Sequence, residues 1–597
     1  MNELEYPFDS QYILTKYRKL KRELLADAGS YPVLKIAILC GATVGIFQDV
    51  LELFLLNNGF RPEFYCGDYN RYYEEGTFGT TALDDFKPDI VYYHISVRNI
   101  LQLLEKGIEQ KTYVAPSAET LSNYIEQALR GVQNRYSCKV IVNNFELLPY
   151  RVMGNADCYH PLGESKLIQD VNHLLATIAQ QNENIYLNDL NYQSAYYGLE
   201  RWFDNSLWYL YKYPFAMDAI PSVAYNVSNI VKSFQGKNKK MLVLDLDNTL
   251  WGGIIGDDGV ENLSLGSETP KGMLYSDFQK YIKKLMRKGV AIAVCSKNEE
   301  EIAISGFTHP ASILSYEDFV MFKANWLEKP FNIEAIASET NILTDSIVFA
   351  DDNPAERKLV SDVLPSIGVL PLDIPENYLR VLDSSGYFEI TSITQDDLKR
   401  NEYYKKNELR KEASSQYSDY SEYLISLNMS ASFRKINPSN ISRVVQLINK
   451  TNQFNMTTRR FTESELQEYL KVNQHYGICA SLQDKFGDNG IVTLALFRIE
   501  STCLYLDNWI MSCRVFQRNL EYALFDKLID FCKENKLTTI VGLFKPTEKN
   551  KVVSNFYQSL DFLFDSKVED VEKWIFKISD YKEKATGIKS EGGFYDE

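Results

Sequence analysis

The stretch Met241–Thr249 reads MLVLDLDNT, and it decides the fold of the middle of the chain. Its first four residues are apolar, as in a strand that is buried on both faces of a parallel sheet. Asp245, Asp247 and Thr249 follow where this strand ends. In open α/β sheets, ligands bind in the crevice outside the carboxyl ends of the strands. The stretch therefore predicts an α/β sheet with carboxylates at its ligand-binding edge.

Two later strands are predicted to end in polar side chains at the same edge. The strand Val290–Val294 leads through Cys295 to Ser296, and the strand Ser346–Ala350 leads to Asp351 and Asp352. Predicted helices alternate with these strands, over Met273–Lys288, Asn332–Ser338 and Ala355–Val363. Since this alternation is typical of a parallel sheet, the strand ends and the intervening Lys329 are expected to share one crevice.

Carboxylates, a hydroxyl and an ammonium group in one crevice suit phosphate chemistry. The chain has only five histidines, and they are scattered, so a histidine-based metal site is not expected. Carboxylate oxygens without histidine favour Mg²⁺, which bridges protein carboxylates and phosphate. An aspartate can attack phosphorus, while a serine hydroxyl and a lysine neutralise the charge of the transferring group.

The order of these residues resembles the haloacid dehalogenase (HAD) superfamily. Four segments resemble more narrowly its FkbH-type members of subfamily IIIC: LDLDNTLWGGIIGDDG at 244–259, VCSKN at 294–298, NWLEK at 325–329 and FADDNPAER at 349–357. The resemblance implies that Asp245 is the nucleophile and Asp247 the general acid and base. It also implies that Mg²⁺ is held by Asp245, the Asp247 backbone carbonyl, and Asp351 or, as second choice, Asp352. Thr249, Ser296 and Lys329 would bind phosphate.

By this resemblance, the expected reaction removes phosphate from 1,3-bisphosphoglycerate and loads the glyceryl group as a thioester onto an acyl carrier protein. Cys295 then has two interpretations: a catalytic thiol that holds the acyl group, or a small core residue that faces away from Ser296. Two rival functions remain. One is a plain phosphatase acting on a small phosphorylated metabolite, and the other is a non-catalytic scaffold that binds carrier proteins.

The amino-terminal part is predicted to be a separate α/β domain. Strands are predicted over Val33–Cys40, Asp89–Tyr93 and Lys139–Asn143, with a helix over Glu164–Gln180. FYCGDYNRY at 64–72 resembles the SGNH-hydrolase-like domain of FkbH-type proteins. An esterase of that kind needs a serine after the first strand, and this chain has Cys40-Gly41-Ala42-Thr43 there. We therefore expect a binding or docking module without hydrolase activity, with Cys40 and His94 as core residues.

The carboxyl-terminal part resembles a GNAT-type acetyltransferase domain. The segments that carry this resemblance are TNQFNMTTRR at 451–460, KFGDNG at 485–490 and MSCRV at 511–515. Arg514 and Arg518 are the predicted cofactor-binding residues, because the family binds a pyrophosphate in the turn that follows. Gln517 and Asn519 stand where the family has glycines. Coenzyme A, a pantetheine arm, or a purely structural role all remain open for this turn.

The 597 residues are thus expected to form three domains and two connecting segments. They are an SGNH-like domain over 1–235, a HAD-like domain without a large cap over 236–392, a helical linker over 393–428, a GNAT-like α+β domain over 429–580 and a disordered polar tail over 581–597. The HAD-like domain has no room for a cap because predicted helices and strands fill the intervals between its motifs.

Composition limits the cell compartments and the classes of partner that we expect for this protein. The net charge of −16 argues against nucleic acid or an anionic membrane as a partner. The nine cysteines form no CxxC pair, so neither a zinc ribbon nor a disulfide framework is expected. There is no apolar run long enough to span a bilayer and no signal-peptide pattern at the start. We therefore expect a soluble, cytoplasmic protein.

Overall fold

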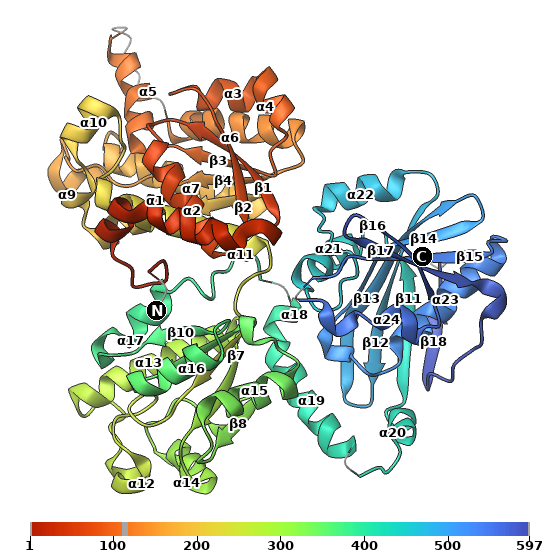
Figure 1. Ribbon diagram of the computed structural model, residues 1–597. Helices are drawn as coiled ribbons and strands as arrows, with labels where there is room; N and C mark the ends of the chain where they lie inside the picture. The colour runs from red at the N-terminus through yellow and green to blue at the C-terminus, as the bar shows by residue number, and fades with distance from the viewer. Residues whose placement is uncertain (1–2, 110–116, 394, 415, 548, 595–597) are drawn as a thin grey trace. The chain divides into compact units, whose positions relative to one another are not determined.

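The computed structural model describes residues 3–109, 117–393, 395–414, 416–547 and 549–594. These residues form two compact units, which are Met1–Ser233 with Glu389–Thr391, and Phe234–Phe388 with Ser392–Glu597. The first unit contains one β-sheet, and the second contains two (Figure 1). Among the described residues, no helix is both long enough and apolar enough to cross a membrane.

The first unit is built on a parallel five-stranded sheet of order β2-β1-β3-β4-β5. Its strands are β1 (Val33–Cys40), β2 (Arg61–Cys66), β3 (Ile90–His94), β4 (Lys139–Asn143) and β5 (Ile185–Asn188). Its helices are α1 (Ser10–Asp27), α2 (Gly45–Asn57), α3 (Tyr72–Phe78), α4 (Thr81–Phe86), α5 (Val97–Glu109), α6 (Ala118–Arg135), α7 (Glu164–Gln181), α8 (Leu190–Tyr197), α9 (Leu199–Trp202), α10 (Asn205–Tyr211) and α11 (Ile220–Phe234). Helices α6 and α7 pack their apolar faces on the sheet.

Polar side chains are buried at the carboxyl ends of β3 and β4. His94 is 1 % exposed and packs against the ring of Phe47 at 4.7 Å, which confirms it as a core residue. Burial lowers its pKa to about 3, so the imidazole is neutral. The Glu146 carboxyl is fully buried and accepts one hydrogen bond, from the Val97 backbone N–H at 3.3 Å. Burial raises the pKa of Glu146 to about 7.

The second unit begins with a parallel sheet of order β10-β9-β6-β7-β8. Its strands are β6 (Met241–Leu244), β7 (Ala291–Ser296), β8 (Met321–Ala324), β9 (Ile347–Asp351) and β10 (Gly368–Pro371). Its helices are α12 (Ile255–Asp258), α13 (Pro270–Arg287), α14 (Glu300–Ser305), α15 (Lys329–Thr340), α16 (Pro354–Val363) and α17 (Tyr378–Ser384). Helices α15 and α16 cover one face of the sheet, and α13 and α17 cover the other. The predicted parallel sheet is confirmed.

The other sheet of this unit is mixed and has the order β16-β17-β15-β14-β13-β12-β11-β18. Its strands are β11 (Met429–Lys435), β12 (His475–Asp484), β13 (Gly487–Glu500), β14 (Cys503–Met511), β15 (Thr539–Phe544), β16 (Leu563–Val568), β17 (Val571–Lys577) and β18 (Ile588–Gly592). The helices around it are α18 (Gln395–Leu398), α19 (Arg400–Ser414), α20 (Tyr420–Ser426), α21 (Ile441–Lys450), α22 (Glu463–Lys471), α23 (Leu520–Glu534) and α24 (Phe556–Ser559). Helices α21 and α22 pack on one face, and α20 and α23 on the other.

The tail does not match the sequence-based prediction. Strand β18 pairs in parallel with β11 along its whole length, and the ring of Phe594 packs against Phe497 and Phe531. The prediction of a disordered tail over 581–597 is therefore wrong for 581–594, because strand pairing and the packing of Phe594 order a segment of polar composition. Residues 595–597 lie outside the described residues. The linker is helical as predicted, through α18 and α19, although Thr394 and Ser415 of that predicted segment also lie outside the described residues.

We predict that Glu146→Gln stabilises the first unit at pH 8 but has little effect at pH 5. The folded pKa of about 7 exceeds the unfolded value, so the native carboxyl keeps its proton between these values. Stability is lost as the pH rises through this window, and the amide, which carries no charge, avoids that loss. The gain at pH 8 should be about 1–3 kcal/mol. Amide exchange of β3 and β4 measures it, with exposed Glu63→Gln as control; equal effects at both pH values would contradict it.

Candidate functional site: a carboxylate cluster with a buried lysine

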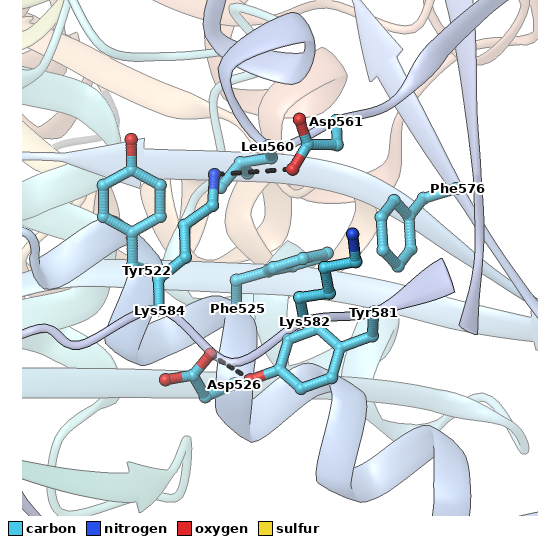
Figure 2. A pocket seen from close by; sticks show the side chains of 9 residues that line it. All are labelled: Tyr522, Phe525, Asp526, Leu560, Asp561, Phe576, Tyr581, Lys582 and Lys584. Carbon is cyan, nitrogen blue, oxygen red and sulfur yellow. Dashed lines mark hydrogen bonds and ion pairs between the residues drawn. The ribbon is translucent and has the colours of Figure 1, made fainter. Parts of the chain in front are cut away.

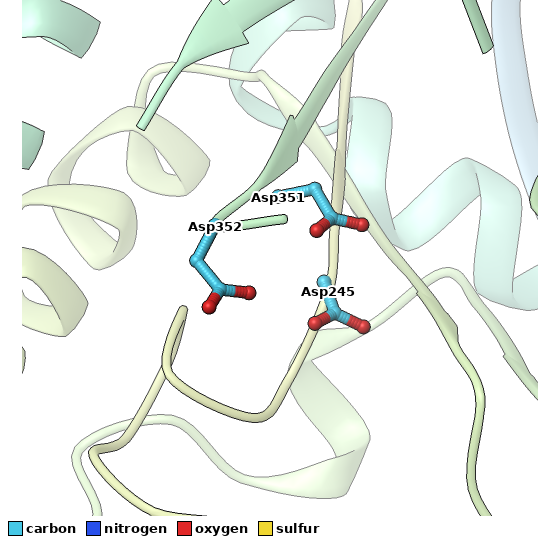
Figure 3. Close-up of side chains that lie close together, drawn as sticks. All are labelled: Asp245, Asp351 and Asp352. Atoms are coloured by element: carbon cyan, nitrogen blue, oxygen red, sulfur yellow. The ribbon is translucent and has the colours of Figure 1, made fainter. Parts of the chain in front are cut away.

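Three adjacent strands of the second unit bring their polar ends together. Asp245 follows β6, while Ser296 and Asp351 are the last residues of β7 and β9. The carboxylates of Asp245, Asp351 and Asp352 face one another, and one oxygen of each lies within 4.8 Å of the others (Figure 3). The alternation of strands and helices predicted this convergence, and the parallel register of β6 with β7 and β9 produces it.

Lys329, the first residue of α15, lies between two of these carboxylates. Its Nζ is 2.8 Å from Asp245 Oδ1 and 2.5 Å from Asp351 Oδ2. Burial alone would lower the pKa of Lys329, but the two carboxylates outweigh it and hold that pKa above its usual value. Burial raises the pKa of Asp245 to about 6, against the opposing effect of Lys329. The lysine is therefore a fixed positive charge beside two desolvated acids.

Asp351 and Asp352 are held differently, although they are neighbours. Asp351 is fully buried, and its Oδ1 accepts a hydrogen bond from the Asn353 backbone N–H at 2.8 Å. The Asp352 backbone N–H donates to Thr249 Oγ1 at 3.2 Å. No described side chain donates a hydrogen bond to the Asp352 carboxylate. Arg357, which sequence analysis did not single out, fixes both residues by donating to their carbonyl oxygens at 2.8 Å.

The Asp247 carboxylate lies outside the cluster and is positioned by three donors. Its Oδ1 accepts from Trp251 Nε1 at 2.9 Å and from the Ile255 backbone N–H at 3.0 Å. Its Oδ2 accepts from Asn298 Nδ2 at 2.8 Å. Asn298 belongs to the VCSKN segment, but no local pattern in that segment assigns it a role. These bonds hold a second carboxylate in one orientation at the same edge of the sheet.

Cys295 does not face the crevice. Its side chain is fully buried in the cluster that joins the sheet to α15 and α16, and its Sγ lies 3.7 Å from the Lys329 backbone carbonyl. Burial raises the pKa of the thiol to about 12. The prediction of a catalytic Cys295 is therefore wrong: neighbours on a strand face opposite sides, and Ser296 takes the crevice side.

The Arg518 side chain is likewise buried, and its guanidinium pairs with groups inside the protein. Its Nη1 is 3.1 Å from Asp484 Oδ2 and its Nη2 donates to Asn407 Oδ1 at 2.9 Å, while Arg410 pairs with the same buried aspartate. The prediction that its guanidinium binds a cofactor phosphate is therefore wrong. The predicted cofactor residue Arg514 lies over the ring of Tyr403 at 4.5 Å. The turn nevertheless adopts φ values of 62° at Gln517 and 59° at Asn519, which is the left-handed conformation that favours glycine.

A small pocket elsewhere in the second unit is a weaker candidate for a functional site. It lies between α23 and the segment after β17, and its polar groups pair with one another: Lys584 with Asp561 at 3.5 Å, and Tyr581 with Asp526 at 2.6 Å (Figure 2). Its lining consists of Tyr522, Phe525, Asp526, Leu560, Asp561, Phe576, Tyr581, Lys582 and Lys584. The carboxylate cluster is therefore the stronger candidate site.

We predict that Lys329→Met destabilises the second unit by about 3–5 kcal/mol at pH 8, because it leaves two buried carboxylates without their cation. Amide exchange of β6 and β9 measures this loss. Adding Asp351→Asn in the same chain should recover part of it, since one of the uncompensated charges is then gone. Lys297→Met is the control: its pair with Glu356 at 2.6 Å is partly exposed, and it should cost less than about 1 kcal/mol. Equal losses in both single variants would refute the prediction.

One family model and several solved structures match parts of this chain. The family model described as FkbH, N-terminal domain, matches residues 35–232. The crystal structure of the N-terminal part of BF1531 from Bacteroides fragilis, which contains a phosphatase domain and is complexed with Mg, is 31 % identical. That match covers 63 % of this chain and 99 % of that chain, with a TM-score of 0.59. No curated protein matches this chain.

Structures of acetyltransferases also match, over about a quarter of the chain, and two examples follow. The ribosomal-protein-S18-alanine N-acetyltransferase from Escherichia coli is 13 % identical over 26 % of this chain and 98 % of its own, with a TM-score of 0.21. The spermidine N-acetyltransferase from Vibrio cholerae, in complex with CoA and spermine, is 12 % identical over 25 % and 96 %, with a TM-score of 0.21. No conclusion is drawn from these two matches, because their TM-scores are low. The match to the BF1531 structure and the match to the FkbH amino-terminal domain show the family: the chain belongs to the FkbH-type proteins.

Proposed function

We propose that this chain is a Mg²⁺-dependent phosphatase of the HAD type. The observation that carries the proposal is the cluster in which Asp245, Asp351 and Asp352 surround a point beside the Lys329 ammonium. This arrangement offers a nucleophilic carboxylate, oxygen ligands for a cation and a fixed positive charge for a phosphoryl group. The BF1531 structure, with its phosphatase domain and Mg, supports the same function.

The donor set fits Mg²⁺, because all three clustered ligands are carboxylate oxygens. Asp245, the Asp247 backbone carbonyl and Asp352 would hold the ion. Asp352 is favoured over Asp351 as the second carboxylate, since both Asp351 oxygens already accept hydrogen bonds, from Lys329 and Asn353. When bound, the ion would draw negative charge from the phosphoryl oxygens and orient them toward Asp245.

Each residue then has a role in two-step phosphate transfer. The Asp245 carboxylate attacks phosphorus, forms an aspartyl-phosphate and breaks the bond to the leaving oxygen. Lys329 and Ser296 neutralise and orient the phosphoryl oxygens. Asp247, held by Trp251 and Asn298, protonates the leaving oxygen and then removes a proton from the water that hydrolyses the aspartyl-phosphate.

We predict that Asp245→Asn lowers phosphate release from phosphomonoesters by at least about 10³-fold, because an amide cannot act as the nucleophile. The change keeps the shape of the side chain, so circular dichroism should be unchanged. Phosphate release in the presence of Mg²⁺ measures the effect. Asp257→Asn, on the exposed surface of α12, is the matched control and should retain activity. Near wild-type turnover by Asp245→Asn would exclude the aspartyl-phosphate route.

A finer version of the proposal is that the chain transfers a glyceryl group from 1,3-bisphosphoglycerate to an acyl carrier protein. The match to the FkbH amino-terminal domain supports this version. Here the carrier thiolate attacks the acyl carbon, the C–S bond forms, and the C–O bond to phosphate breaks. Since Cys295 is buried, the thioester would sit on another cysteine or form directly on the carrier, and we propose the direct route. The phosphate is then the leaving group, and Lys329 and Ser296 would stabilise its charge.

We expect a carrier protein incubated with the enzyme, Mg²⁺ and 1,3-bisphosphoglycerate to gain the mass of one glyceryl group. Intact-mass spectrometry detects the gain, and a carrier without its phosphopantetheine arm is the control. Cys295→Ala should load the carrier as well as the wild type does. If phosphate is released and no carrier gains mass, the chain is a plain phosphatase, and this version of the proposal fails.

A further inference from the structure

The loop 144–163 of the first unit presents large apolar side chains to solvent. It connects β4 to α7, and its residues Tyr150 and Val152 are 71 % and 88 % exposed. Helix α10 adds Tyr209 and Leu210, which are 70 % and 71 % exposed. Single apolar residues on a surface need no explanation, but several that lie together mark an interaction site.

These four residues lie together because the loop and α10 are in contact. Asn205, the first residue of α10, donates from its Nδ2 to the Tyr150 hydroxyl at 3.4 Å. Residues four positions apart share one face of a helix, so Tyr209 stands on the side of α10 that meets Tyr150. Val152 and Leu210 extend this surface along the loop and the helix. The apolar patch is therefore Tyr150, Val152, Tyr209 and Leu210.

The backbone beneath the apolar patch is anchored to the interior of the first unit. The Arg98 guanidinium lies 5.2 Å from the ring of the buried Trp208 and donates to Asn205 Oδ1 at 2.9 Å. Within the loop, the buried Asp157 carboxylate accepts a hydrogen bond from the Ser165 backbone N–H at 2.8 Å. Because this backbone is already fixed, docking on the patch costs little conformational entropy.

The surroundings of the apolar patch carry little charge, which decides the kind of partner. In 144–163, all of which the structure describes, Arg151 is the only charged residue that is exposed. Helix α10, NSLWYLY, contains no charged residue. A strongly charged partner would find no complementary charges here, whereas a neutral apolar surface is complementary to a copy of itself. The net charge of −16 makes two copies repel each other unless faces of low charge meet.

We propose that the apolar patch is the interface through which two copies of this chain form a dimer with twofold symmetry. In a twofold interface the same surface is buried on both copies. Tyrosine suits such an interface, because its ring buries a large apolar area while its hydroxyl stays hydrated at the rim. The proposal concerns the first unit and is independent of the phosphatase function proposed above.

Light scattering after size-exclusion chromatography tests the proposal on the full chain. At micromolar concentration, the wild type should have twice the mass of the 68.8 kDa chain. Val152→Asp should weaken the dimer at least about 100-fold, because a twofold interface buries the new carboxylate twice and without a partner. Val552→Asp is the matched control: Val552 is 67 % exposed and lies in the second unit, so this variant should stay dimeric. Circular dichroism checks that both variants are folded.

Amide exchange of the wild type is a second measurement that needs no variant. Residues 149–153 and 205–211 should exchange more slowly at high than at low protein concentration, because only the dimer covers them. Raising the salt from about 0.05 M to about 0.5 M should not weaken the dimer, since salt screens the repulsion between copies and the interface holds few ion pairs to lose.

Three results would overturn the proposal. The first is a wild type that is monomeric at every concentration; protection of the apolar patch in that monomer would mean that the second unit covers it. The second is a dimer that Val152→Asp weakens no more than Val552→Asp does, because the interface then lies elsewhere. The third is a dimer that salt dissociates, because its interface is then held by charged groups.

Discussion

The buried ion triad of Asp245, Lys329 and Asp351 is the constraint on which the candidate site depends. Two carboxylates in an almost dry environment are tolerated only because one ammonium lies within 2.8 Å of both. That requirement explains the surrounding geometry: α15 begins at the lysine itself, β6 and β9 pair so that their ends coincide, and Arg357 and Asn353 hold the backbone and carboxylate of Asp351. With Asp352 included, the cluster still has more negative than positive groups. A bound divalent cation would balance this excess of negative charge, and this is why the same cluster supports a catalytic interpretation rather than a purely structural one.

Much of this arrangement was accessible from the sequence, because apolar strands followed by polar residues are local patterns. Strand β6 was predicted with its observed bounds, and the convergence of Asp245, Ser296, Lys329 and Asp351 followed from the alternation of strands and helices. What failed depended on orientation or on distant partners. Neighbouring residues of a strand face opposite sides of the sheet, so only one of Cys295 and Ser296 can face the crevice. The sequence does not show which one, because either residue type fits either side. The partner of Arg518 is Asp484, 34 positions away, and no local pattern signals that pair. The pairing of β18 with β11 is similarly non-local, so a polar composition was a poor guide to the tail.

The second unit uses charged residues in two distinct ways. Around Asp484, two arginines and the backbone N–H groups of Phe486 and Gly487 satisfy the carboxylate, and nothing in the cluster is left for a ligand. At Asp352, by contrast, the backbone is fixed by Thr249 and Arg357 while the carboxylate itself receives no hydrogen bond from a described side chain. Asp484 is buried and Asp352 is half-buried. The difference in hydrogen bonding separates an acid that holds the fold together from one that is available to a cation.

The burial of Cys295 beneath Lys329 has a practical consequence for labelling. Thiol reagents attack the thiolate, and a sealed thiol with a raised pKa reacts slowly. Cys66 and Cys158 are exposed, and both belong to the first unit. A maleimide fluorophore would therefore attach to these two thiols before the half-buried Cys503 and Cys513 of the second unit, and it would leave Cys295 beside the carboxylate cluster unmodified. Once Cys503 and Cys513 are replaced, the native thiols thus provide a handle for spectroscopy of the first unit, without any introduced cysteine.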